Sequence, residues 1–176
     1  SSVLLLMALA AAGTGRINEA LRLEQRVLAS STGSGGAAKW ARLWASLQLA
    51  ELRVAARKKR QTTVLASLLR MTRRLGVLRD ARPLRVLLTW YHPEAGIELW
   101  AARPGGRKPR FERANANGPQ FGIEAFAVRR QESGAYTVEV RRVARSRNRT
   151  LKAILWVLWD EGQPTEQLRR IEVTLD

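Results

Sequence analysis

The sequence predicts an α+β protein of two domains, with helical hairpins over residues 1–80 and an antiparallel β-sandwich over residues 84–176. Two observations support this prediction. Apolar residues recur at helical spacing as far as residue 80, and from Arg85 onwards they alternate along the chain as in a strand. Between the two patterns lies Asp80-Ala81-Arg82-Pro83, where proline disfavours a helix at the residue before it. The domain boundary is therefore expected at this segment.

The first segment, residues 1–13, consists almost entirely of small and apolar side chains. Such a run could be the core of a signal peptide, but no basic residues precede it and helical periodicity follows directly. We expect a packed helix instead. Because the sequence starts at Ser1 rather than at a methionine, we also expect a processed or trimmed piece of a longer chain.

Residues 13–29, 37–60 and 61–79 carry apolar side chains at helical spacing. With the first segment they predict two αα-hairpins, joined by a flexible Ser/Gly-rich connector at residues 30–36. The apolar positions are Ile17, Ala20, Leu21, Val27 and Leu28 in the first; Trp40, Leu43, Trp44, Leu47, Leu49, Leu52, Val54 and Ala56 in the second; and Val64, Leu68, Met71, Leu75 and Leu78 in the third. The second helix is apolar on two sides, so we expect it between other layers.

Six or seven strands are expected after residue 84. Val86, Leu88 and Trp90 lie on one side of the opening strand, and a break at residues 92–96 separates it from a second strand with Ile97 and Leu99. The remaining expected strands lie in residues 107–113, where the pattern is weak, and in residues 121–129, 136–140, 153–159 and 171–175. Residues 153–159 are apolar on both faces, which indicates a central or covered strand. Six or seven strands with short turns predict an antiparallel β-sandwich, with longer loops expected at residues 114–119 and 141–150.

The helical half resembles one tetratricopeptide repeat. The matching residues are Ala8, the run Gly15-Arg16-Ile17-Asn18-Glu19-Ala20-Leu21, and Val27-Leu28. The resemblance covers about one repeat length of 34 residues. It departs from the family at Glu24, where an aromatic residue is usual, and at Thr32, where proline often closes the repeat. A repeat of this kind cannot bury its apolar face alone, so the resemblance implies neighbouring repeats.

The second half resembles a bacterial β-sandwich domain of uncharacterised function. The matching runs are Leu88-Thr89-Trp90, I-E-L-W-A-A-R-P-G-G over residues 97–106, F-G-I-E-A-F over residues 121–126 and G-A-Y-T-V-E-V over residues 134–140. The resemblance implies a place behind tetratricopeptide, VIT or von Willebrand A modules, and a cell-envelope or secreted location. Two aspartates of that family correspond to Gly96 and Glu98 here, so no metal site is carried over.

The chain is strongly basic, with 31 Lys and Arg against 15 Asp and Glu and a net charge of +16. Residues 1–82 carry 15 basic and 4 acidic side chains, so the helical half supplies most of this charge. Nearly all of the basic residues are arginines. Arginine suits bidentate contacts with phosphate or carboxylate groups, although the bias could equally reflect genome composition.

We predict that the helical half binds a partner through a basic surface. Its residues are Arg57, Lys58, Lys59, Arg60, Arg70, Arg73 and Arg74. The same residues could bind nucleic acid, extended by Arg141, Arg142, Arg145, Arg147 and Arg149, or could simply be a solvated face. Aromatic residues that would stack on bases are not interleaved with these cations, because Trp40 and Trp44 lie on an apolar stripe. An acidic protein or peptide is therefore the preferred partner.

Enzymatic function is not predicted. The sequence has no cysteine, which removes thiol catalysis and Cys-ligated zinc. His92 is the only histidine, so His-based metal sites and Ser-His or Cys-His catalysis lack parts. Glu94 and Glu98 could form a carboxylate pair, but two surface carboxylates around a turn are far more common. The segment Gly13-Thr14-Gly15 joins two helices and follows no strand, so it does not fit a nucleotide-binding loop. We predict no cofactor and no metal.

Four tryptophans of the second half could line a sugar-binding platform. Trp90 and Trp159 occupy inward positions of their strands, so we expect them in the core. Trp100 and Trp156 are the candidates for a second exposed or interdomain face.

Together these features predict a non-enzymatic binding and scaffolding protein, the C-terminal part of a larger bacterial repeat protein. The groove between the helical hairpins would offer a concave basic surface to an acidic peptide. The alternative is a protein that binds polyanions, either nucleic acid or an acidic glycan. No run of apolar residues is long enough to predict a membrane span.

Overall fold

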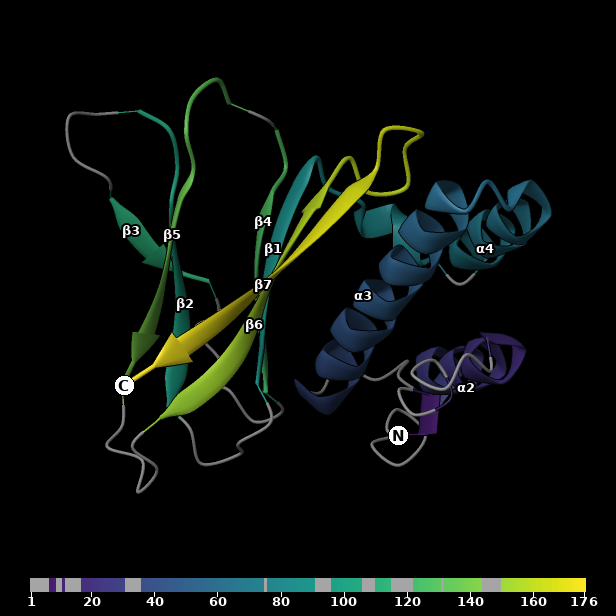
Figure 1. Ribbon diagram of the computed structural model, residues 1–176, viewed down its shortest axis with the longest axis horizontal. Coiled ribbons are helices and arrows are strands. Elements are labelled where there is room, and N and C mark those ends of the chain that lie inside the picture. Colours follow the sequence, from purple (N-terminus) through teal and green to yellow (C-terminus); the bar gives the residue numbers. More distant parts are fainter. Residues whose placement is uncertain are drawn as a thin grey trace. The chain divides into compact units, whose positions relative to one another are not determined.

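The computed structural model describes residues 7–8, 11, 17–30, 36–74, 76–90, 96–105, 110–114, 122–130, 132–143 and 150–176. The fold is α+β, as predicted, with helices followed by two antiparallel sheets (Figure 1). The chain divides into two compact units, Ser1–Ala81 and Arg82–Asp176. Among the described residues, no helix is both long enough and apolar enough to span a membrane.

The first unit contains α2 (Ile17–Ser30), α3 (Gly36–Lys58), α4 (Thr62–Arg74) and the short 3-10 helix η1 (Val77–Asp80). One apolar cluster joins α3, α4 and η1, and half-buried residues of α2, α3 and α4 pack against it. Its buried members are Ala45, Leu49, Ala56, Leu68 and Val77. A smaller cluster brings together the small side chains Ala8, Ala11 and Ala20 with Leu23. Both apolar stripes predicted for α3 include buried residues, among them Leu47 and Leu49.

The prediction for α4 was wrong at its end and on one face. The helix stops at Arg74 instead of continuing to Arg79, because Gly76 adopts the left-handed conformation at φ 70° and its N–H caps Arg73 O at 3.0 Å. Val64, expected on the apolar stripe, is 40% exposed. Thr72 is buried instead, and its hydroxyl donates to Leu68 O at 2.9 Å.

The second unit contains a four-stranded sheet in the order β4-β1-β6-β7 and a three-stranded sheet in the order β3-β2-β5. The strand bounds are β1 Leu84–Trp90, β2 Ile97–Ala102, β3 Phe111–Arg113, β4 Ile123–Val128, β5 Thr137–Arg142, β6 Leu151–Trp159 and β7 Gln167–Leu175. All pairs are antiparallel. The central position of β6, between β1 and β7, confirms the prediction from its apolar faces.

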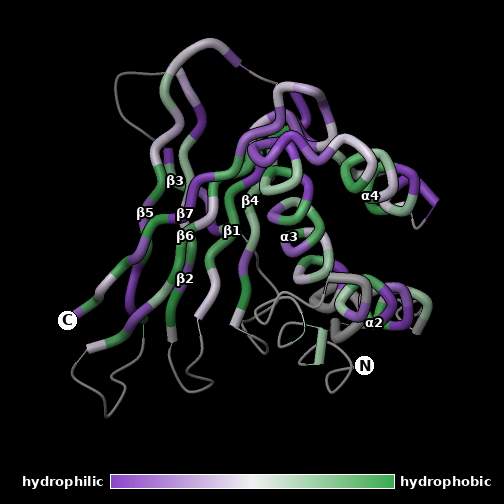
Figure 2. Tube along the Cα trace, turned by 45° about the vertical axis from the view of Figure 1, so that its right-hand side comes forward, coloured by the Kyte–Doolittle hydropathy of each residue, from purple (hydrophilic) through white to green (hydrophobic). Residues whose placement is uncertain are grey.

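The two sheets share one hydrophobic core, as in a β-sandwich. Val86, Leu88 and Trp90 from β1 belong to it together with Ile97 and Leu99 from β2. Figure 2 shows the pattern behind this packing: apolar residues recur along β1, β2 and β6 and hydrophilic residues interrupt them. Trp159 packs against the core and Trp90 lies within it, as their inward positions predicted.

A buried ion pair ties the start of β1 to the turn after β6. The guanidinium of Arg85 donates to Glu161 Oε2 from Nη2 at 2.8 Å and from Nε at 3.1 Å. The same oxygen accepts the backbone N–H of Arg82 at 3.2 Å, while Glu161 N donates to Arg82 O at 3.2 Å. Asp160, which precedes Glu161, has a left-handed φ of 50°. The carboxylate of Glu161 therefore fixes both the turn and the first residues of the sheet.

Candidate functional site

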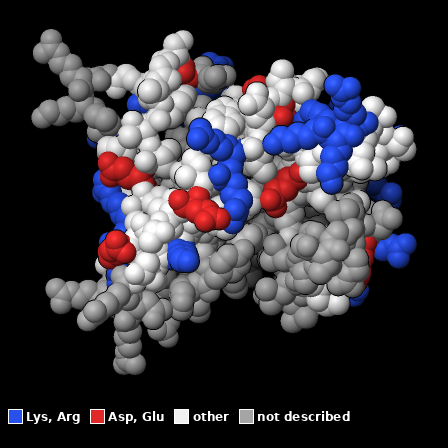
Figure 3. All heavy atoms as spheres, in the orientation of Figure 1, with Lys and Arg blue, Asp and Glu red and all other residues white. Residues whose placement is uncertain are grey.

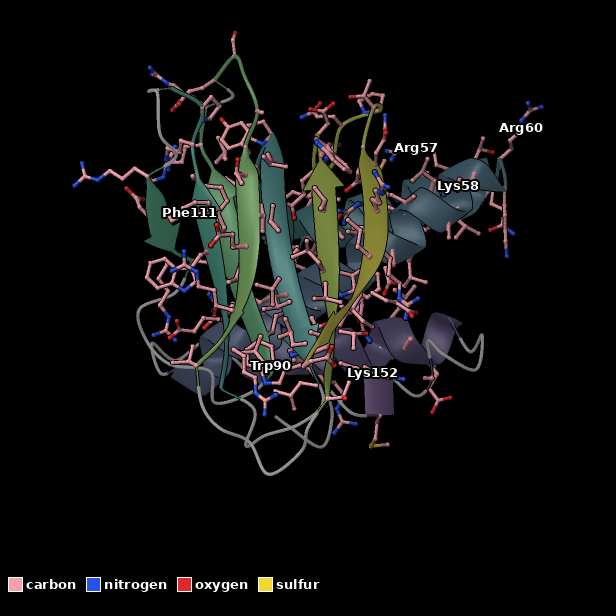
Figure 4. The ribbon with its side chains drawn as sticks, turned by 60° about the vertical axis from the view of Figure 1, so that its left-hand side comes forward. Arg57, Lys58, Arg60, Trp90, Phe111 and Lys152 are labelled. Atoms are coloured by element: carbon pink, nitrogen blue, oxygen red, sulfur yellow. The ribbon has the colours of Figure 1, made fainter. Side chains whose placement is uncertain are left out.

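The basic surface begins at the C-terminal end of α3. Lys58, Lys59 and Arg60 are exposed and Arg57 is half-buried. Figure 4 shows Arg57 and Lys58 on the last turn of α3 and Arg60 just beyond it, with its side chain pointing outward. Cations at this end of a helix interact favourably with its dipole, which is a structural reason for some of this charge.

Arg60 has a backbone conformation that glycine normally provides. Its φ is 54°, and the turn is closed by two backbone bonds, Arg60 N to Arg57 O at 3.0 Å and Gln61 N to Ala56 O at 2.9 Å. These are the two bonds of a Schellman motif, in which the left-handed residue after the helix is usually glycine. An arginine costs roughly 1 kcal/mol there, because its Cβ approaches the following carbonyl. The exposed cation thus occupies a strained backbone position.

The other three residues of the basic surface lie on α4. Arg70, Arg73 and Arg74 are all exposed and share one helical face, and Arg70 Nη2 donates to Ser67 Oγ at 3.3 Å. The ten residues from Arg60 to Arg70 correspond to about 15 Å along a helix axis. The seven residues therefore form two groups, one at each end of α4, rather than one continuous patch.

The charge of this region is of one sign only. Residues 52–79 contain nine basic residues and no acidic residue. Figure 3 shows positive side chains gathered over the C-terminal end of α3 and over α4. Arg141, predicted as an extension of the basic surface, belongs to the second unit and lies over an aromatic ring there. Arg145, Arg147 and Arg149 lie outside the described residues.

Trp100 and Trp156 do not form a common face, because they belong to different sheets. Trp156, on β6, is only 8% exposed, and its indole N–H donates to Thr89 Oγ1 at 2.9 Å. Trp100, on β2, is half-buried on the side of its sheet that faces away from the core residues Leu99 and Ala101. Trp100 is thus the more exposed of the two candidates for the second face, and the assignment of both residues to such a face stays a prediction.

Trp100 lies within a polar and aromatic cluster on the three-stranded sheet. The Arg141 guanidinium carbon is 4.5 Å from the centroid of the Trp100 ring and 5.5 Å from that of Phe111, which comes from β3 (Figure 4). Arg141 also donates to Glu139 Oε2 at 2.6 and 2.8 Å. The indole N–H of Trp100 donates to Glu98 Oε2 at 2.9 Å. Arg141 therefore already occupies the cation position over this ring.

Glu98 shares its ion-pair partner, Arg113, with Glu124, a carboxylate that sequence reasoning did not select. Arg113 lies between two glutamates, with Nη1 at 2.6 Å from Glu98 Oε1 and Nη2 at 3.3 Å from Glu124 Oε1. Glu124 is fully buried, and its Oε2 accepts the backbone N–H of Leu99 at 2.6 Å. Glu94 and His92, the neighbours expected from the sequence, lie outside the described residues.

A sequence signal for Glu124 exists. Glu124, Phe126 and Val128 alternate along β4, and both Phe126 and Val128 belong to the core. A carboxylate in the inward phase of a strand needs a buried partner. Its partner Arg113 lies eleven residues away on the three-residue strand β3. The alternation of residues 107–113 is too weak to predict the position of this strand, so the sequence did not identify Arg113 as the partner.

Both carboxylates of this cluster have the guanidinium of Arg113 as their cationic partner. The carboxylate of Glu98 forms an ion pair with the guanidinium of Arg113. Among the described residues, no three His, Cys, Asp or Glu side chains are grouped as metal ligands. The arrangement thus links the two sheets through Glu124 of β4 and Leu99 of β2.

Replacing Glu124 with glutamine tests how the charge of this buried carboxyl affects the stability of the contact between the two sheets. Burial raises the pKa of Glu124 above its ordinary 4.5, although the Leu99 N–H and Arg113 lower it. The folded state therefore binds this proton more tightly than the unfolded state, so its contribution to the free energy of unfolding falls as pH rises from 4.5 through the raised pKa. We expect the wild type to lose stability relative to Glu124→Gln over that pH range. Urea unfolding at a series of pH values measures the difference, and a pH-independent difference would contradict it.

Comparisons of the chain with protein families, with curated proteins and with solved structures gave no significant match.

Proposed function

We propose that the chain is a non-enzymatic binding and scaffolding module that recognises an acidic protein or peptide through the basic surface. The supporting observation is the one-sided charge of residues 52–79, with nine basic and no acidic residues. Six of the seven basic-surface residues are exposed. In this proposal the helical unit acts as a tetratricopeptide-like part of a larger bacterial repeat protein, and the sandwich is its second domain.

The left-handed conformation of Arg60 supports a role for its charge. Glycine would relieve the strain at φ 54° and would keep both backbone bonds of the turn. Strained positions are often retained at functional sites. An arginine here is explained if its exposed guanidinium contacts a partner.

An acidic peptide fits this surface better than a nucleic acid does. Residues 52–79 contain no aromatic side chain, so unpaired bases would find no stacking partner there. Guanidinium groups form bidentate bonds with carboxylates as well as with phosphates. A partner with two acidic clusters about 15 Å apart would match the two groups of cations along α4. Polyanion binding is the alternative, in which the same cations neutralise phosphate or glycan charges.

Reversing three charges on α4 tests the proposal. The variant Arg70→Glu/Arg73→Glu/Arg74→Glu is expected to bind a labelled glutamate-rich peptide at least about tenfold more weakly, because like charges then face the ligand. Fluorescence anisotropy measures the affinity, with a DNA duplex as the parallel probe at about 50 and about 150 mM salt.

The matched control reverses three exposed cations of the second unit, in Arg110→Glu/Arg129→Glu/Arg130→Glu. This variant changes the net charge by the same amount as the α4 variant. If both variants lost the same affinity for the peptide, the effect would depend on net charge alone, which would contradict binding by a defined surface.

Arg60→Gly should be slightly more stable than the wild type and should bind the peptide less tightly. Binding of the duplex in preference to the peptide would replace the proposal by its polyanion alternative, and binding of neither probe would overturn both.

A further inference from the structure

Strand β7 forms an open edge of the four-stranded sheet. It follows β6 in the order β4-β1-β6-β7, and within the described part of the chain no strand pairs with its other side. It has nine residues, whereas β4 at the opposite edge has six. An edge strand of this length presents a row of backbone donors and acceptors to any strand that fits it.

The hydrogen bonds of the inner strands show which β7 residues face this edge. Trp90 N donates to Gly122 O at 2.9 Å, so the even-numbered residues of β1 bond toward β4. Bonding alternates between the two sides of a strand, so the odd-numbered residues of β1 bond toward β6. Asp160 N agrees with this pattern, since it donates to Pro83 O at 3.0 Å.

The alternation continues through β6 to β7. The even-numbered residues of β6 bond toward β1, so the odd-numbered ones, such as Leu155, bond with their β7 partners, such as Ile171. The even-numbered residues of β7 therefore direct their N–H and C=O groups to the open edge. These residues are Leu168, Arg170, Glu172 and Thr174.

One register of this edge pairs both of its charges, Arg170 and Glu172, with each other. If two copies of β7 pair antiparallel about a twofold axis at Ile171, Arg170 of each copy lies opposite Glu172 of the other, and Leu168 lies opposite Thr174. Moving the axis to Arg170 places two arginines opposite each other, and moving it to Glu172 places two glutamates opposite each other. A shift that pairs odd with even residues loses the backbone bonds.

The two charges are available for this pairing. The Arg170 and Glu172 side chains are 50% and 74% exposed, and they form an ion pair within the strand at 2.9 Å. Arg170 is also held 5.8 Å from the centroid of the Trp156 ring. In Figure 3, positive and negative side chains lie side by side on the face over β7. Opposite charges on directly opposed residues stabilise antiparallel strand pairs, whereas like charges destabilise them.

We propose that β7 binds β7 of a second copy of this chain, with the twofold axis at Ile171. The pairing joins the two four-stranded sheets into one continuous sheet and makes the interface isologous. Strand pairing alone forms a small interface, so the dimer is expected to be concentration-dependent over roughly 10 µM to 1 mM.

Two single charge reversals test the register, with sedimentation velocity of the full chain as the measurement. Arg170→Glu places two carboxylates opposite each other, and Glu172→Arg places two guanidinium groups opposite each other, so each variant should dimerise at least about tenfold more weakly than the wild type. A mixture of the two variants should form a heterodimer, because both charge pairs are then complementary. The double swap Arg170→Glu/Glu172→Arg should restore the homodimer.

Arg169→Glu is the matched control, because it changes the net charge as Arg170→Glu does but lies opposite Val173 in this register. It should leave the dimer in place. Circular dichroism confirms that each variant is folded, and the heterodimer shows that neither single variant has lost a functional β7. A wild-type chain that stays monomeric up to about 1 mM overturns the proposal. So does a dimer that is unchanged in both single variants, or one that Arg169→Glu weakens equally.

Discussion

Replacing Glu161 with alanine is expected to lower the free energy of unfolding of the second unit by about 3–5 kcal/mol. The carboxylate accepts three bonds at Oε2, two from the Arg85 guanidinium and one from Arg82 N. Its side chain is fully buried and that of Arg85 is 10% exposed. Removing it leaves a buried guanidinium without this counter-charge, which costs more than the pair contributes when intact. Urea unfolding followed by tryptophan fluorescence measures the loss.

Two comparisons separate this effect from a general loss of an ion pair. Glu139→Ala breaks the Arg141–Glu139 pair, whose side chains are 44% and 40% exposed, and should cost less than about 1 kcal/mol. The double variant Arg85→Met/Glu161→Leu removes both buried charges, so it should recover part of the stability that Glu161→Ala loses. A loss from Glu161→Ala no larger than that from Glu139→Ala would contradict the assigned role of this carboxylate.

The sequence predicted most closely the strands in which apolar residues alternate with polar ones, and the strand that is apolar on both faces. Val86, Leu88 and Trp90 alternate along β1, and all three enter the core. The apolar faces of β6 matched its place between β1 and β7. In these segments the burial of side chains and the local pattern require the same structure, so the local pattern is sufficient.

The end of α4 shows where a local pattern fails. Leu75 and Leu78 continue the helical spacing beyond Arg74, but Gly76 adopts a left-handed conformation that ends the helix. Apolar spacing does not reveal this, since a glycine within a helical pattern is tolerated at a cost of about 1 kcal/mol. The exposure of Val64 is a second failure of the local pattern. Whether an apolar side chain of α4 is buried depends on how the helix packs against its neighbours, which its own sequence does not determine.

In the candidate site, too, some features follow from the local sequence and others do not. The exposure of Lys58, Lys59 and Arg70 follows from their charge, because lysine and arginine are rarely buried. Contacts across strands do not follow from local sequence. The separation of Trp100 and Trp156 onto two sheets, and the bridge from Glu98 through Arg113 to Glu124, depend on strand order and register.

Replacing Gly122 with alanine is expected to cost about 3 kcal/mol or more, because it combines backbone strain with overlap of a neighbouring backbone. Gly122 has a φ of 65°, and an added Cβ would overlap the carbonyl oxygen of Trp90 and lie 3.3 Å from its carbonyl carbon. The chain cannot move away freely, since Trp90 N donates to Gly122 O at 2.9 Å. Relief of the overlap therefore weakens the first bond between β1 and β4. Urea unfolding measures the loss.

Gly105→Ala separates the two contributions. Gly105 also has a positive φ, 111°, but a Cβ there would meet no atom of the described residues within 4 Å. It should cost only the backbone strain, about 1–2 kcal/mol. The excess loss in Gly122→Ala then measures the close approach of β4 to β1 beside Trp90, a residue of the shared core. Equal losses in the two variants would mean that the approach at Gly122 contributes nothing beyond the conformation of its backbone.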